Sequence, residues 1–143
     1  SIYPHVKKIF QVNNPWFNGE ATVLTYSIEE LLATKLRALY QRKKGRDLYD
    51  FWYATRQISG LNIQKIIDIF QYYMKDENTQ VSRAEFEKNL SLKQKNPIFN
   101  SDIKPLLPPN QAKQYQPNEA YKILCADFLP KLKGDPWKEL QDE

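Results

Sequence analysis

The sequence feature that most restricts the fold is a pair of Ser-x-x-Glu motifs, each followed by apolar residues at helical spacing. In such a motif the serine oxygen can accept a hydrogen bond from the glutamate amide, and the glutamate carboxylate can reach back to the serine amide. The motifs begin at Ser27 and Ser82. We therefore expect a first helix over about residues 28–43 and a fourth, more polar helix over about residues 83–94.

Other caps and breaks predict the remaining helices. Gly45 is expected to end the first helix in the left-handed conformation, with a second helix following over about residues 46–58. Asn62 is expected to cap a third helix that reaches residue 75. Residues 97–107 indicate a short helix or turn, and a proline-rich surface loop leads to a last long helix from about residue 117.

The first 26 residues have a different pattern. Two β-like runs, residues 5–12 and 21–26, flank the turn-forming segment NNPWFNGE. An isolated pair of strands is marginal in water, so either the helices or further strands must cover it. The expected fold class is mainly α, a helical bundle of about five helices with a short N-terminal β-hairpin.

Composition excludes several protein classes. Four glycines cannot build a GxGxxG or Walker loop, and the single histidine excludes an HExxH motif. The single cysteine, Cys125, excludes an internal disulfide and a Cys/His zinc site, and its place in an apolar stripe predicts a buried, inert thiol. No apolar run approaches the roughly 18 residues of a membrane span, and the start lacks a secretory signal. We therefore expect a cytoplasmic protein without a membrane anchor.

The first expected helix carries a charge on its apolar face. Lys35 falls within a stripe of aliphatic residues, and Arg42, seven residues further on, shares that face. The stripe consists of Ile28, Leu31, Leu32, Leu36 and Leu39. A lysine in this position must reach water, pair with an acid or hold an anion, because burying an unpaired charge is strongly unfavourable.

The second expected helix supplies acids for that face. Asp47 projects on the same side as the apolar residues of its helix, and Asp50 lies about 60° away. In an antiparallel hairpin, Arg42 and Arg46 would lie near both aspartates, with Lys35 about two turns further along. One interpretation is a structural ion-pair network. The other is a cleft for a polyphosphate and its metal, since these side chains neutralise phosphate or bind magnesium.

The net charge of +4 permits an anionic partner, and its distribution is uneven. Residues 35–46 contain six cations and no acid. This local excess would attract phosphates if it were displayed on one face, whereas a solvated helix end is the simpler explanation.

Residues 25–54 resemble the AbiEii/AbiGii-type nucleotidyltransferases, toxins of type IV toxin–antitoxin and phage abortive-infection systems. The family pattern is a Glu-Leu-Leu-x-x-Lys helix, a downstream Arg and then Arg-Asp-x-x-Asp. The matching residues are Glu30, Leu31, Leu32, Lys35, Arg42, Arg46, Asp47 and Asp50. The later part of the chain is similar to the family in layout more than in diagnostic residues.

The resemblance implies that the chain is the C-terminal half of an α+β nucleotidyltransferase with a polymerase β-like fold. Such an enzyme would use Mg²⁺ to transfer a nucleotide from a nucleoside triphosphate to an RNA acceptor, which is tRNA in some members. The resemblance also implies that Lys35 and Asp47 are catalytic. Lys35 would neutralise triphosphate charge, and Asp47 would orient a substrate hydroxyl or support the metal site. Arg42, Arg46 and Asp50 would bind substrate. A cognate antitoxin is the expected protein partner.

Two family motifs have no counterpart in these residues. The sequence contains neither a Gly-Ser turn nor an Asp-x-Asp strand, which binds the metals in the family. We therefore expect an inactive C-terminal portion: an excised fragment, a truncated product or half of a split enzyme. Residues 1–26 would be terminal strands of an incomplete sheet, and residues 27–143 a helical domain carrying the Lys and Arg-Asp-x-x-Asp motifs. The alternatives are a non-catalytic module that binds RNA or antitoxin, and a purely structural helical domain.

Overall fold

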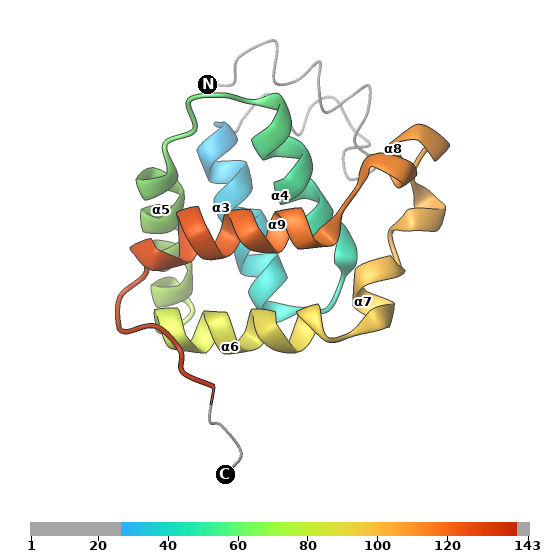
Figure 1. The fold of residues 1–143 in the computed structure, drawn as a ribbon. Coiled ribbons are helices and arrows are strands. Elements are labelled where there is room, and N and C mark those ends of the chain that lie inside the picture. The colour runs from blue at the N-terminus through green and yellow to red at the C-terminus, as the bar shows by residue number, and fades with distance from the viewer. Residues whose placement is uncertain (1–26, 140–143) are drawn as a thin grey trace.

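A computed structural model describes residues 27–139, which form seven α-helices (Figure 1). Short 3₁₀ segments at Lys104–Leu106 and Leu129–Lys131 and a π-helical segment at Leu124–Phe128 complete the secondary structure of this region. The α-helices are α3 (Ile28–Gln41), α4 (Gly45–Gln57), α5 (Ile63–Asp76), α6 (Arg83–Gln94), α7 (Pro97–Ser101), α8 (Pro109–Gln114) and α9 (Pro117–Ile123).

The predicted fold class is wrong. The regular secondary structure within residues 27–139 consists of helices alone, with no strand. The seven α-helices of this region also exceed the five or so that were expected. The β-like runs at residues 5–12 and 21–26, on which the predicted hairpin depended, lie outside the described residues. The turn signals and β-branched residues of that region are local cues that carry no information about a sheet partner.

The helix starts expected from local caps are confirmed. Ser27 accepts a hydrogen bond from the Glu30 amide, 3.1 Å, and begins α3. Asn62 accepts one from the Lys65 amide, 3.0 Å, and Ser82 forms a complete capping box with Glu85. These contacts satisfy backbone donors that a helix leaves open at its first turn.

Helices α3 and α4 form the expected antiparallel hairpin (Figure 1). The predicted role of Gly45 is wrong, because Gly45 is the first residue of α4, and residues 42–44 make the turn. A glycine is required there for another reason. A Cβ on Gly45 would collide with the Asp102 carboxylate and the Phe99 carbonyl oxygen, so α7 can approach only a residue without a side chain.

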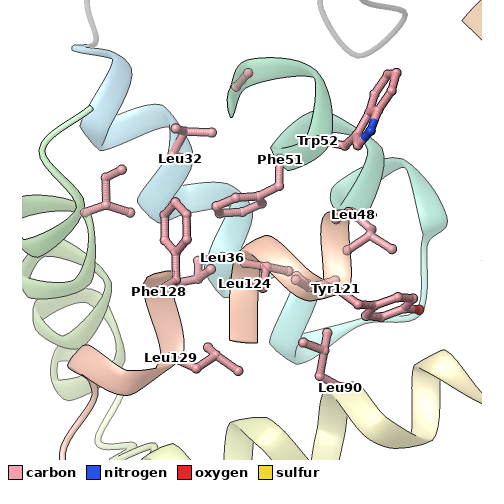
Figure 2. Close-up of a cluster of buried hydrophobic side chains, with 14 of the residues drawn as sticks. Leu32, Leu36, Leu48, Phe51, Trp52, Leu90, Tyr121, Leu124, Phe128 and Leu129 are labelled. Atoms are coloured by element: carbon pink, nitrogen blue, oxygen red, sulfur yellow. The ribbon is translucent and has the colours of Figure 1, made fainter. Parts of the chain in front are cut away.

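The core lies where α3, α4, α5, α6 and α9 meet. Helix α3 packs between α4 and α5, α9 crosses α4, and α6 contacts both α3 and α9 (Figure 1). Aliphatic and aromatic side chains from all these elements fill the space between them. Figure 2 labels Leu32, Leu36, Leu48, Phe51, Trp52, Leu90, Tyr121, Leu124, Phe128 and Leu129 among them.

The C-terminal part departs further from expectation. The last long helix is confirmed from Pro117, but it changes to π-helix at Leu124–Phe128. The predicted burial of Cys125 is wrong, because the residue is exposed; partial burial still raises the pKa of its thiol. Within residues 27–139 no helix combines the length and apolarity needed to span a membrane.

Candidate functional site

The α3–α4 hairpin buries a cluster of opposite charges. The Lys35 ammonium on α3 lies 3.2 Å from Asp47 Oδ1 and 3.0 Å from Asp50 Oδ2, both on α4. The lysine is 3% exposed, and both aspartates are fully buried. The stripe predicted for α3 therefore faces the core with Lys35 inside it, and the lysine pairs with acids instead of reaching water.

Arg42 completes the cluster from the turn after α3. Its Nε and Nη2 atoms each donate a hydrogen bond of 2.8 Å to the Asp47 carboxylate, a bidentate contact. This hydrogen bonding raises the pKa of the Arg42 guanidinium. With 47% of its side chain exposed, Arg42 connects the buried charges to the surface. Lys35 was expected about two helical turns away from the contact between Arg42 and Asp47. In the structure, Asp47 contacts both Lys35 and Arg42.

Asp50 is the least satisfied member of the cluster. Its Oδ1 atom is buried and accepts no hydrogen bond from the described residues. Burial raises the pKa of Asp50 to about 7, although the neighbouring Lys35 lowers it. The charge of Arg46, which is partly buried, lowers it further. At neutral pH this carboxyl group is therefore poised between its charged and protonated forms.

The first turn of α4 is held by α7. The Asp102 carboxylate accepts a hydrogen bond of 3.1 Å from the Gly45 amide, one of the open donors at the helix start. Because Asp47 lies two residues further on, this contact fixes the part of α4 that carries the charges. Sequence reasoning missed Asp102, because the two partners are 57 positions apart in the sequence and no local signal connects them.

A cavity lies beside the exposed side of the cluster, between α3 and α6. We call it the α3–α6 cavity, and its volume is about 270 Å³. Arg42, Lys43 and Lys93 contribute to its lining, whereas Lys35, Asp47 and Asp50 do not.

Sequence reasoning also missed Lys93. It is 4% exposed and was expected on a merely polar helix. Its spacing of seven residues from Phe86 and three from Leu90 places it on the buried stripe of α6. The analysis of apolar spacing that placed Lys35 on the buried face of its helix would also have identified Lys93.

The aspartates of the cluster do not by themselves fit a magnesium ion. Asp47 is engaged by Lys35 and Arg42, and Asp50 by Lys35. A divalent ion takes several oxygen ligands, and among the described residues no group of three or more His, Cys, Asp or Glu side chains converges.

The structure thus brings together four of the five residues that sequence analysis singled out. Lys35, Arg42, Asp47 and Asp50 are linked by ion pairs. Arg46 lies on the same turn of α4 as Asp47 and acts on Asp50 through its charge. The cluster joins a cation and an acid from two consecutive helices, with one arginine open to a cavity.

Comparison with known proteins identifies the family. No curated protein and no solved structure matches this chain. A family model described as "Nucleotidyl transferase AbiEii toxin, Type IV TA system" matches residues 1–123. This range contains the whole charged cluster and the α3–α6 cavity, and it is most of the sequence. The chain therefore belongs to the AbiEii family of nucleotidyl transferase toxins of type IV toxin–antitoxin systems.

Proposed function

We propose that this chain supplies Lys35 and Asp47 to the transfer of a nucleotide from a nucleoside triphosphate to an RNA acceptor, a tRNA. One observation carries the proposal. The lysine and the first aspartate of the family pattern, twelve residues apart, lie 3.2 Å from each other across the α3–α4 hairpin. Membership of the family supports nucleotide transfer as the reaction class and an antitoxin as the protein partner.

The roles we propose follow from the charges. Lys35 neutralises the charge of the triphosphate. To do so, it gives up its contact with Asp50 and contacts a phosphate group instead. The pKa of Asp50 near 7 favours this exchange, because a protonated Asp50 releases the lysine charge. Asp47 is held in place by its two hydrogen bonds from Arg42 and orients the attacking hydroxyl. Arg46, together with Arg42, adds positive charge for substrate binding.

The reaction needs parts that these 143 residues do not hold. Neither a Gly-Ser turn nor an Asp-x-Asp sequence occurs among them. In phosphoryl transfer, magnesium ions bridge carboxylates and the triphosphate. We propose that Asp-x-Asp carboxylates in another segment hold Mg²⁺, and that residues 1–143 alone are inactive.

A non-catalytic module that binds RNA or antitoxin is the second candidate. The observation that favours it is the closure of the cluster, in which Lys35, Asp47 and Asp50 are buried and paired with one another. Such a network can serve only to set the packing of two helices.

The test uses the toxin expressed from its whole coding sequence. Lys35→Met and Asp47→Asn remove one charge each with little change in shape, and Leu48→Ala removes fully buried apolar volume from the same helix as a control. We expect the two charge variants to lose nucleotide transfer and toxicity, and Leu48→Ala to retain transfer in proportion to its folded fraction. Normal transfer by either charge variant at matched folded fraction would assign the cluster a structural role.

A further inference from the structure

The α3–α6 cavity carries an excess of positive charge. Its lining contains Arg42, Lys43 and Lys93 but no carboxylate. The side-chain amides of Asn89 and Asn96 also line it, and amides can donate hydrogen bonds to an anion. A cavity of about 270 Å³ holds a phosphate group and several waters.

Lys93 is the second observation that indicates an anion. Its ammonium is buried and donates to the Leu39 carbonyl oxygen and, at 2.7 Å, to Asn89 Oδ1. The ammonium also lies 6.0 Å from the centroid of the Phe99 ring. An ammonium has three donors, so its two hydrogen bonds leave one. No carboxylate within residues 27–139 lies at ion-pair distance from it. A buried cation without an acidic partner is unfavourable, and an anion in the cavity would offset that cost.

The end of α3 at this cavity would ordinarily repel an anion, because the last carbonyl groups of a helix carry partial negative charge. Here those groups are occupied. Lys93 donates to the Leu39 carbonyl oxygen, and the Asn89 amide donates to the Tyr40 carbonyl oxygen at 3.0 Å. The cations beyond the helix end, Lys43 and Lys44, are both exposed.

We propose that the α3–α6 cavity binds a phosphate group of an RNA strand. The choice of RNA rests on the function proposed above, and one feature of the surface supports it. Leu92, which is 63% exposed, lines the cavity beside the cations and offers an apolar contact for a sugar or base. A nucleoside triphosphate shares the phosphate chemistry, so the test includes it.

The experiment measures binding of fluorescently labelled, deacylated tRNA to the full chain over a series of salt concentrations. Lys43→Gln removes a lining charge, and Lys44→Gln removes an exposed neighbouring charge outside the lining. We expect Lys43→Gln to weaken binding about three- to tenfold and to reduce the slope of log affinity against log salt by about one. Lys44→Gln should weaken binding less than about twofold.

A second variant tests the buried cation. Lys93→Gln keeps a hydrogen-bond donor but removes the charge, and it should weaken tRNA binding at least as much as Lys43→Gln. Thermal melting identifies the fraction that is folded. Equal effects of Lys43→Gln and Lys44→Gln, or no effect of Lys43→Gln, would overturn the proposal.

Two further arms replace the probe. If Lys43→Gln weakens the binding of ATP but not of tRNA, the phosphate in the cavity belongs to a nucleotide. If Lys43→Gln weakens the binding of polyglutamate as much as that of tRNA, the cavity does not select phosphate. Either result overturns the RNA assignment. The outcome is separable from that of the proposed reaction. Selective loss of tRNA binding in Lys43→Gln, in a toxin whose Lys35→Met variant still transfers nucleotide, would support the cavity and refute the proposed catalytic role.

Discussion

Helix α4 packs on two sides that differ in chemistry. Toward α3 it presents Asp47 and Asp50, which meet Lys35 and Arg42. Another side carries aromatic contacts: Tyr49 and Trp52 meet Tyr115 edge-on, with ring centroids 5.0 and 5.1 Å apart, and Phe51 meets Phe128 at 5.3 Å. Aromatic burial is a direct source of stability. Buried charges, by contrast, are weak sources of stability, so the charged side needs another explanation.

The largest expected effect comes from breaking the charged side. Asp47→Ala removes one of the two aspartates that lie at ion-pair distance from the buried Lys35, together with both hydrogen bonds from Arg42. We expect a loss of about 3–5 kcal/mol in the free energy of unfolding, as for other buried ion pairs that lose one partner. Urea denaturation measures it.

The matched experiment replaces the whole buried set. The triple variant Lys35→Met, Asp47→Leu, Asp50→Leu should be about as stable as the unaltered chain, because apolar groups of similar volume avoid the cost of burying charge. If the triple variant is as unstable as Asp47→Ala, then the charges themselves stabilise the hairpin and the contrast between the two sides of α4 disappears.

The next effect concerns the start of α4. In Gly45→Ala the new methyl group meets the Asp102 carboxylate and the Phe99 carbonyl oxygen, so α7 must move. We expect a loss of about 1–3 kcal/mol, as for other overpacked sites, partly offset by the better helix propensity of alanine. Thermal or urea denaturation detects it.

Gly60→Ala is the control for that prediction. Nothing lies near a Cβ at Gly60, whose φ of +74° instead disfavours any side chain. The loss in the free energy of unfolding caused by Gly60→Ala should therefore be the same with or without the Asp102 carboxylate. The loss caused by Gly45→Ala should become smaller when Asp102 is replaced by alanine. Equal costs in both backgrounds would show that contact with α7 does not explain the glycine.

Sequence alone predicted the first four helices well, and the reason is local. Capping residues such as Ser27 and Ser82 form hydrogen bonds within one helical turn. The spacing of the apolar residues identifies which face of a helix is buried. The same logic placed Lys35 on a packing face. The meeting of Lys35 with Asp47 required the additional assumption of an antiparallel hairpin, which holds.

What sequence could not predict depends on distant contacts. The role of Gly45 is set by Asp102 and Phe99, more than fifty residues away, and the change to π-helix at Leu124–Phe128 has no simple sequence signature. Proline-rich residues 104–118 suggested a loop, yet they contain α8 and deliver the buried Tyr115 to the aromatic side of α4. Proline marks helix starts as well as breaks.

Titration of Asp50 gives a pH-dependent prediction for the charged side. Its pKa of about 7 in the folded chain lies above the value of about 3.9 in an unfolded chain, so the folded state holds the extra proton between these values. Stability contributed by Asp50 is therefore greatest below about pH 4 and is lost as the pH rises through about 7. In Asp50→Asn this loss is absent.

The measurement compares urea denaturation of the two proteins at about pH 5 and about pH 7.5, which bracket most of this window. We expect Asp50→Asn to be less destabilising, relative to the unaltered chain, at the higher pH. The opposite trend would mean that Lys35 holds Asp50 ionised throughout, and the proposed release of the lysine charge would fail. Glu119→Gln serves as a control because its carboxylate is about half exposed.

The smallest effect is expected at the rim of the aromatic side. Arg56 lies over the Trp52 ring, 4.7 Å from its centroid, and 3.5 Å from the Glu119 carboxylate, with about half of each charged side chain exposed. Exposed ion pairs and cation–π contacts each contribute about 1 kcal/mol or less, so Arg56→Ala should lower the free energy of unfolding by about 0.5–1 kcal/mol. Arg56→Lys should recover part of this. A loss as large as that of Asp47→Ala would show that a charge at the rim matters as much as a buried one, and burial would then no longer distinguish the two sides of α4.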